Sequence, residues 1–347
     1  MKLYGTTWTR REIEARVGRI EQIGGVRRYR CSEGPEAGTE MIQVRTGGGL
    51  AYWVSPSKGL DISLAEYGGV PISWQSGNGD VHPAFYDAGD DEWLRTASGG
   101  LLMTCGLTQV GSPCAEAGRK FGLHGRIHHT PARHVSVVAE WLGDEYEMRI
   151  RGVMEETSIF GEQLRLTRTI SSRLGDNRLN IDDTVENIGF QPCPHMMLYH
   201  VNFGFPLLAE HTVVELPAAR VSSRDAAGDL DSIRTWQAPD PGWREQVYDH
   251  LLLPDAHRDK WPVVAIRNPD FPCPAAGTRQ ISAELSWDPA TLPRFVQWRM
   301  PGAGVHALGI EPSNCFVSGR AEERSKGTLR MLGPGETVIY RLQLNIR

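Results

Sequence analysis

Most periodic segments of this chain alternate hydrophobic and polar positions with a period of two residues. The alternation is clear in residues 146–150, 164–170 and 337–346, which are also rich in β-branched and aromatic residues. Successive side chains of a strand point to opposite faces of a sheet, so this pattern is typical of strands with one buried face. The sequence therefore predicts a protein built mainly of β-strands.

Turn signals separate these strands. Residues 142–145 contain Gly143-Asp144, and residues 174–177 contain Gly175-Asp176; each group lies between two alternating runs. Glycine and aspartate readily adopt the backbone angles of hairpin turns. The pattern predicts a meander of antiparallel hairpins, and no βαβ alternation or long linker divides the chain. We expect an all-β fold, one large antiparallel β-sandwich that forms a single domain over residues 1–347.

Two segments depart from this pattern. Thr9 and Glu12 have the spacing of a capping box, and apolar residues follow at positions 13, 17 and 20. This spacing predicts a short N-terminal helix that ends before the glycine pair at 24–25. Residues 218–260 show no clear periodicity, and we expect them to form long loops over one face of the sandwich. Such loops often carry binding sites.

Composition narrows the classes of function. The 347 residues include 38 Gly and 22 Pro, which argues against a helical bundle, and 37 Lys and Arg against 42 Asp and Glu give a net charge of −5. Nucleic acids and anionic membranes select clustered cations, so neither is an expected partner. No apolar stretch resembles a signal peptide or a membrane span, and we expect a cytoplasmic protein. The six cysteines contain no C-x-x-C pair, which favours reduced thiols.

Several catalytic signatures are absent from the sequence. It contains no phosphate-binding loop, no dinucleotide fingerprint, no G-x-S-x-G and no H-E-x-x-H motif. We therefore expect no cofactor. Chemistry must come from histidine, carboxylate and arginine side chains.

The first candidate segment spans residues 122–129. On a strand, His124 and Arg126 would share one face and could hold a ligand with hydroxyl or anionic groups. The alternative is that both are exposed residues of a turn. His124, His128 and His129 could also be read as a metal set, but no acidic ligand is spaced with them, and we expect no metal site.

Two further segments place polar groups in apolar surroundings. Alternation over residues 198–206 puts His200 and Asn202 on one strand face, where burial would require hydrogen bonds to the protein or to a ligand. Glu311 lies in an apolar strand directly before Pro312, which holds the preceding residue extended. A fixed, partly buried glutamate has a raised pKa and suits general-base catalysis. The alternative for Glu311 is an ion pair with an arginine.

In these segments the chain resembles the aldose 1-epimerase-like proteins of the galactose-mutarotase-like superfamily, most closely a bacterial branch. The resemblance covers most of the chain. The matching motifs are Lys58-Gly59-Leu60-Asp61-Ile62, Gly99-Gly100-Leu101-Leu102, Thr104-Cys105-Gly106-Leu107, Leu123-His124-Gly125-Arg126, Tyr199-His200-Val201-Asn202, Gln297-Trp298-Arg299 and Gly309-Ile310-Glu311-Pro312-Ser313-Asn314. The resemblance implies a supersandwich with a sugar cleft on one concave face.

The resemblance also implies roles for individual residues. His200 would protonate the ring oxygen, Glu311 would take the proton of the anomeric hydroxyl, and His124 would bind the sugar near the ring oxygen. Such a pair predicts a bell-shaped pH dependence, with Glu311 protonated at low pH and His200 deprotonated at high pH. Lys58 stands where the branch usually has arginine, and Asp249 or His250 is the candidate for the carboxylate position. The expected substrate contacts are Lys58, Asp61, Arg126, Asn202, Asp249, His250, Gln297, Arg299 and Asn314.

Three functions remain open from the sequence. The first is mutarotation of a free or modified monosaccharide, neutral or anionic. The second is keto-sugar isomerase, epimerase or lyase chemistry, in which Glu311 takes a proton from carbon. The third is sugar binding without turnover. A monosaccharide is the expected partner in all three, and a homodimer is left open.

Overall fold

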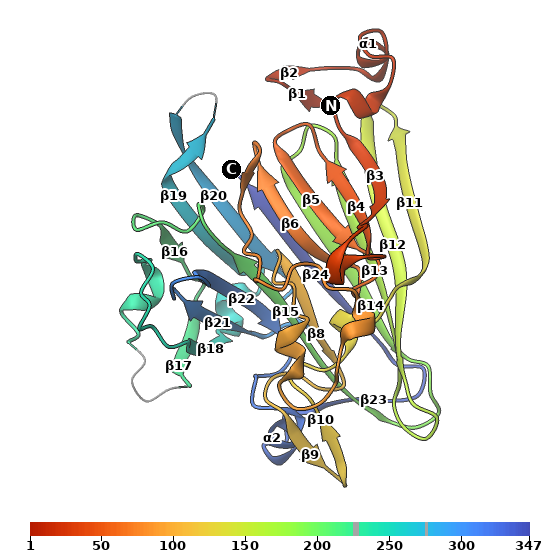
Figure 1. The fold of residues 1–347 in the computed structure, drawn as a ribbon, viewed down its shortest axis with the longest axis vertical. Coiled ribbons are helices and arrows are strands. Elements are labelled where there is room, and N and C mark those ends of the chain that lie inside the picture. The colour runs from red at the N-terminus through yellow and green to blue at the C-terminus, as the bar shows by residue number, and fades with distance from the viewer. Residues whose placement is uncertain (225–228, 275–276) are drawn as a thin grey trace.

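Two antiparallel sheets dominate the structure, a computed structural model that describes residues 1–224, 229–274 and 277–347 (Figure 1). One sheet has eight strands and the other has twelve. All of their pairings are antiparallel. Side chains from both sheets join in one hydrophobic core, so the sheets form the sandwich that the alternation predicts.

The eight-stranded sheet has the order β11-β12-β13-β14-β24-β20-β19-β16. Its strands are β11 (Arg133–Leu142), β12 (Glu145–Thr157), β13 (Gln163–Arg173), β14 (Arg178–Asn187), β16 (Val213–Glu215), β19 (Val263–Cys273), β20 (Gly277–Trp287) and β24 (Thr337–Ile346). Burial alternates along β12 and β13. Both predicted hairpin turns are present, and Gly143 and Gly175 adopt the positive φ angles that favour glycine, 64° and 83°.

The twelve-stranded sheet has the order β17-β18-β21-β22-β15-β8-β6-β5-β4-β3, with β7 beside β6 and β23 beside β15. Its strands are β3 (Gly25–Arg30), β4 (Glu40–Arg45), β5 (Leu50–Ser55), β6 (Asp61–Tyr67), β7 (Val70–Pro71), β8 (Leu102–Leu107), β15 (Cys193–Phe203), β17 (Ala219–Ser223), β18 (Gln246–Leu252), β21 (Arg294–Met300), β22 (Ala307–Ser313) and β23 (Arg330–Leu332). Its central strands, β22, β15 and β8, are buried along nearly their whole length.

The remaining elements are short. In the described part of the chain they are two small hairpins, two short helices and several 3₁₀ turns. The hairpin strands and helices are β1 (Lys2–Leu3), β2 (Thr6–Thr7), β9 (Cys114–Glu116), β10 (Arg119–Phe121), α1 (Arg10–Glu14) and α2 (Arg320–Ser325). The 3₁₀ turns are η1 (Ile20–Gln22), η2 (Gly34–Glu36), η3 (Pro83–Phe85), η4 (Glu92–Arg95), η5 (Ile127–His129), η6 (Ser232–Arg234) and η7 (Pro254–His257). No helix in the described part of the chain is long and apolar enough to cross a membrane. All six cysteines are free thiols, and three of them are buried.

Two predictions about these elements are wrong. The capping box of Thr9 and Glu12 is present, but α1 ends at Glu14 and only a 3₁₀ turn forms near Ile20. Gly18, a poor helix former, interrupts the apolar spacing between them. Residues 218–260, expected to be loops, contribute β17 and β18 to the edge of the large sheet. The polar residues of β17 and β18 interrupt the alternation that would have predicted strands. Residues 225–228 of this segment lie outside the described residues.

Candidate active site

One row of side chains crosses the centre of the large sheet. The pairing of Val201 with Ile310 sets His200 on β15 opposite Glu311 on β22. Met103 pairs with His200 on one side, and Val296 pairs with Glu311 on the other. Because adjacent strands place paired residues on the same face, these four side chains lie together. The opposite face of β15 packs into the main core.

His200 and Glu311 make the central contact of this row. His200 Nε2 lies 3.2 Å from Glu311 Oε1, and both residues are buried, with 7% and 2% of their surface exposed. Burial raises the pKa of Glu311 well above its usual value, and Asp249 and Glu245 raise it further. Burial also lowers the pKa of His200 to about 4. Both shifts favour the neutral forms, a protonated carboxyl group on Glu311 and an uncharged imidazole on His200.

His124 approaches the same place from a loop. It has a φ angle of 56° and lies between β10 and η5, so it is not on a strand as predicted. Its backbone donates a hydrogen bond to Gly111 and accepts one from Gly106, and its Nδ1 accepts a hydrogen bond from the Gly111 N–H at 3.3 Å. This contact leaves the ring proton on Nε2 as a donor. The His124 ring centroid is 5.8 Å from that of His200.

A cleft of about 400 Å³ contains His124, His200 and Glu311. Aromatic rings and a few polar groups form its walls. Among the wall residues are Trp74, Trp93, Trp298, Asp91, Arg224 and Glu245. Glu245 accepts a hydrogen bond from Trp298 Nε1 at 3.1 Å and one from Arg224 Nη2 at 2.8 Å. Such a mixture of aromatic faces and convergent polar groups is typical of small-molecule sites.

A second hollow, of about 460 Å³, lies between η7 and the loop after β20. Trp261, Asp288 and His257 are among its lining residues. None of the predicted site residues lines it, so its slightly larger volume does not make it the candidate site. The cleft with the buried His200–Glu311 contact is the better candidate.

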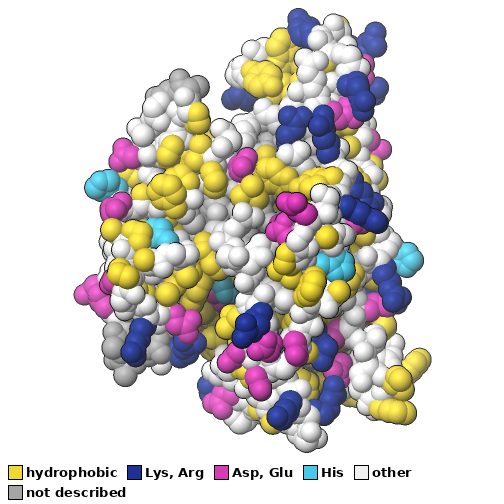
Figure 2. Space-filling view, viewed as in Figure 1, with side chains coloured by type: hydrophobic (Ala, Val, Ile, Leu, Met, Phe, Trp, Pro, Cys, Tyr) yellow, Lys and Arg dark blue, Asp and Glu magenta, His cyan; other side chains and the backbone are white. Residues whose placement is uncertain are grey.

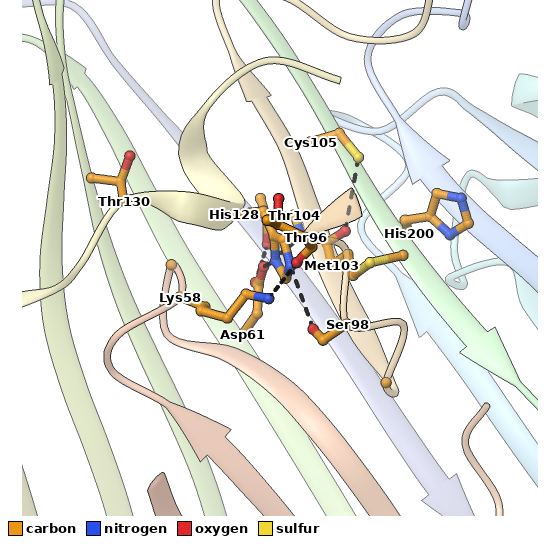
Figure 3. Close-up of polar contacts among 12 residues, drawn as sticks. Lys58, Asp61, Thr96, Ser98, Met103, Thr104, Cys105, His128, Thr130 and His200 are labelled. Carbon is orange, nitrogen blue, oxygen red and sulfur yellow. Dashed lines mark hydrogen bonds and ion pairs between the residues drawn. The ribbon is translucent and has the colours of Figure 1, made fainter. Parts of the chain in front are cut away.

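Four predicted substrate contacts lie behind the cleft instead of in its lining. Lys58 Nζ donates to Thr96 O at 2.7 Å, and burial lowers the pKa of Lys58 to about 8. Asp61, Asn202 and Asn314 are engaged with the protein. Asn202 donates to Gly100 O and His200 O, and Asn314 binds the Met197 N–H and Tyr340 hydroxyl. Asp61 accepts hydrogen bonds from the side chains of Thr104, His128 and Arg168, and the first two are labelled in Figure 3.

Three others, His250, Gln297 and Arg299, lie on the opposite face of the large sheet. Along β21, Val296 and Trp298 line the cleft, so the intervening Gln297 and the following Arg299 point away from it. Gln297 binds Ile233 O and His250, while Arg299 lies over the rings of Trp236 and Trp243. Asp249 pairs with Val296 and shares the cleft face, but it does not line the cleft.

Arg126 is also separated from the cleft. Residues 122–126 form a turn, so the predicted strand face shared by His124 and Arg126 does not exist. Arg126 is exposed and lines a different small hollow with Arg119 and Glu156. The alternative reading, an exposed turn residue, describes Arg126 correctly.

The polar wall residues Asp91, Arg224 and Glu245 and the ring of Trp74 were missed by the sequence analysis. They come from loops that carry no motif, with Arg224 directly after β17 and Glu245 directly before β18. The repeated tryptophans were the one available signal, because exposed polar loops seldom contain this residue.

Among the described residues, no group of three or more His, Cys, Asp and Glu side chains is arranged to hold a metal ion. Charged groups of both signs are interspersed over the face shown in Figure 2.

Comparison with known proteins agrees with this fold. The model of a family described as a domain of unknown function, DUF4432, matches residues 36–346. No curated protein matches the chain.

Solved structures share the architecture at low sequence identity. One named "putative aldose 1-epimerase", from Klebsiella pneumoniae, is 24% identical with a TM-score of 0.84, and the match covers 92% of this chain and 83% of that one. A galactose mutarotase-like protein from Clostridium acetobutylicum is 13% identical, with a TM-score of 0.60 and coverage of 94% and 99%. A galactose 1-epimerase from Lactobacillus acidophilus is 11% identical, with a TM-score of 0.58 and coverage of 93% and 99%. The predicted galactose mutarotase-like fold is confirmed.

Proposed function

The chain belongs to the DUF4432 family and has the galactose mutarotase-like fold, and from the chemistry of its cleft we propose that it interconverts the α and β anomers of a free or modified monosaccharide. The contact of His200 Nε2 with Glu311 Oε1 at 3.2 Å carries the proposal. Two oxygens on one anomeric carbon, the ring oxygen and the C1 hydroxyl, are similarly close. A paired acid and base can therefore serve both oxygens of one sugar.

The His200–Glu311 pair carries one titratable proton before the reaction and one after it. In the favoured form the proton is on Glu311, and its transfer to His200 gives a carboxylate and an imidazolium. Glu311 then takes the C1 hydroxyl proton while His200 donates to the ring oxygen. The C1–O5 bond breaks, and C1 becomes an aldehyde. The pair is then in the neutral form that burial favours, so the ring-opened state matches the surroundings of the site. Rotation about C1–C2 and reversal of both transfers closes the ring as the other anomer.

His124 supports this chemistry as a hydrogen-bond donor. Its Nδ1 is occupied by the Gly111 N–H, so Nε2–H is the group available to a sugar oxygen. Burial lowers the pKa of His124 to about 3, which keeps it neutral at physiological pH. We propose that it orients the sugar ring. Trp93 and Trp298 offer apolar faces to the ring carbons, and Glu245 offers carboxylate oxygens to its hydroxyls.

The pH dependence of kcat follows from the pair having one proton in its active form. A second proton goes to His200, whose lowered pKa of about 4 places the loss of activity at strongly acidic pH. The last proton leaves Glu311, whose raised pKa sets the alkaline limb. His200 therefore sets the acidic limb and Glu311 the alkaline limb, which is the reverse of the assignment expected from the sequence. Stopped-flow polarimetry across pH should show an acidic limb near pH 4 and an alkaline limb set by Glu311; a fall of activity as the pH is lowered from 7 to 5 would contradict this assignment.

A panel of freshly dissolved single anomers tests the proposed function. Aldoses, uronates and ketoses are followed by one-dimensional proton NMR with and without the protein, in the presence of EDTA because the proton transfers use side chains alone. We expect faster exchange of the H1 signals for at least one aldose or uronate. Absence of acceleration across the panel, despite binding seen by line broadening, would favour the sugar-binding alternative.

A further inference from the structure

Asp61 is saturated by donors of the protein itself. Its Oδ1 accepts from Thr104 Oγ1 at 2.5 Å and from Arg168 Nη1 at 2.6 Å. Its Oδ2 accepts from the Thr104 backbone N–H and from His128 Nδ1, both at 2.7 Å. Only 2% of the residue is exposed. A carboxylate with this set of partners is not available to hold a sugar hydroxyl, although the resemblance placed it among the substrate contacts.

The donors bound by Asp61 belong to the backbone that holds the candidate catalytic groups. Thr104 lies on β8, next to Met103, which pairs with His200. His128 lies in η5, four residues after His124. Two residues beyond Thr104, Gly106 donates to the carbonyl of His124 and accepts from the N–H of Arg126. Asp61 therefore ties β8 to the loop that carries His124 through side-chain and backbone bonds together.

His128 is the link between Asp61 and this loop. It is 1% exposed, and its ring centroid lies 5.8 Å from that of Trp93, a cleft wall residue. Because Nδ1 donates to Asp61, the opposite ring nitrogen is an acceptor and faces Ser98 Oγ at 3.5 Å. Figure 3 shows His128, Asp61 and Lys58 together, with His200 apart from them on β15, the strand that pairs with β8. The cluster thus lies beside the site without entering it.

We infer that Asp61 and His128 are positioning residues, which fix the His124 loop against β8 and never contact the substrate. The inference rests on the proposed function only where kcat is used as a readout. Removing the Asp61–His128 bond should let the His124 loop shift. A displacement of about 1 Å at a catalytic group can lower kcat about 100-fold.

The test uses His128, because replacing Asp61 would also strip the buried Arg168 of a partner. His128→Leu removes the donor and keeps a buried side chain of apolar character. His128→Asn restores an N–H at the position of Nδ1. We expect His128→Leu to lower kcat by roughly 10- to 100-fold with KM changed less than about twofold, and His128→Asn to recover most of the activity. Tyr52→Phe, which removes another buried hydrogen bond (Tyr52 to Ser172, 3.0 Å), controls for lost stability.

A second readout does not need activity. Long-range ¹H–¹⁵N spectra of histidine-labelled protein report the His124 ring, whose Nδ1 is an acceptor in the parent. We expect the His124 signals to shift in His128→Leu and to stay in place in His128→Asn and Tyr52→Phe. Parental His124 signals in a folded His128→Leu protein would overturn the inference, as would a His128→Asn protein no better than His128→Leu. If the parent accelerates no anomer exchange, the proposed function fails, but the spectra still decide the positioning role.

Discussion

Glu311→Gln is expected to lower kcat for anomer exchange by about 10² to 10⁴, and His200→Asn by a similar factor, because each removes one of the two proton transfers. Both side chains are almost fully buried and approach each other at 3.2 Å. Glutamine and asparagine are close in shape to the residues they replace, so circular dichroism should show a folded protein. The double variant should lose little more than either single variant, because the two groups act as one unit.

A matched control lies on the same strand. His195 on β15 is also fully buried, but it binds Leu107 O and the Tyr340 hydroxyl far from the cleft lining. His195→Asn should lower the free energy of unfolding, by about 1 to 3 kcal/mol for a disrupted buried polar group, and leave kcat near that of the parent. Equal losses of kcat in His195→Asn and His200→Asn would show that the effect is structural.

Gly309→Ala is expected to reduce kcat nearly as strongly. Gly309 lies on β22 two residues before Glu311, and a Cβ added there would lie 2.6 Å from Glu311 Oε1 and 3.1 Å from His200 Cε1. Real Cβ atoms do not approach so closely, and the free end of the Glu311 side chain can move more easily than the backbone. The carboxylate should rotate away from His200. We expect kcat to fall about 10²-fold or more with little change in the free energy of unfolding.

Gly302→Ala is the matched control for Gly309→Ala. A Cβ at Gly302 would lie 2.6 Å from Cε of Met300, again the end of a flexible side chain, but neither residue lines the cleft. The two variants therefore introduce the same kind of contact, one inside the site and one outside. Thermal unfolding and anomer exchange are measured on both. Parental activity in Gly309→Ala would mean that the position of the Glu311 carboxylate does not control the rate.

The strands were predictable because one buried face enforces period-two alternation over long stretches. β12, β13 and β24 follow that pattern and form as expected. β17 and β18 were missed because their polar residues interrupt the alternation. β17 is the edge strand, and β18 pairs with β21, which lies far along the chain. The predicted helix after Thr9 was too long, because the apolar spacing alone does not take account of Gly18, a poor helix former.

His200 and Glu311 could be singled out from the sequence as candidates, and the structure brings them within 3.2 Å of each other, but their surroundings could not be predicted. Alternation places Gln297 and Arg299 on one face of β21 and Trp298 on the other, yet the sequence does not say which face meets the cleft. The pairing register decides which face it is: Val296 pairs with Glu311, so Val296 and Trp298 face the cleft and Gln297 and Arg299 face away from it. The expected strand around Arg126 is a turn, and the wall residues Trp74 and Glu245 meet only in three dimensions.

Two-dimensional exchange NMR in D₂O tests the central claim most directly. The best aldose or uronate of the panel is equilibrated with catalytic amounts of the protein. We predict exchange cross-peaks between the α and β H1 signals with the parent, none above background with Glu311→Gln, and full retention of the H2 signal, because mutarotation breaks no C–H bond. Loss of the H2 signal to deuterium would assign Glu311 to proton abstraction from carbon, and cross-peaks of equal strength with Glu311→Gln would contradict the account.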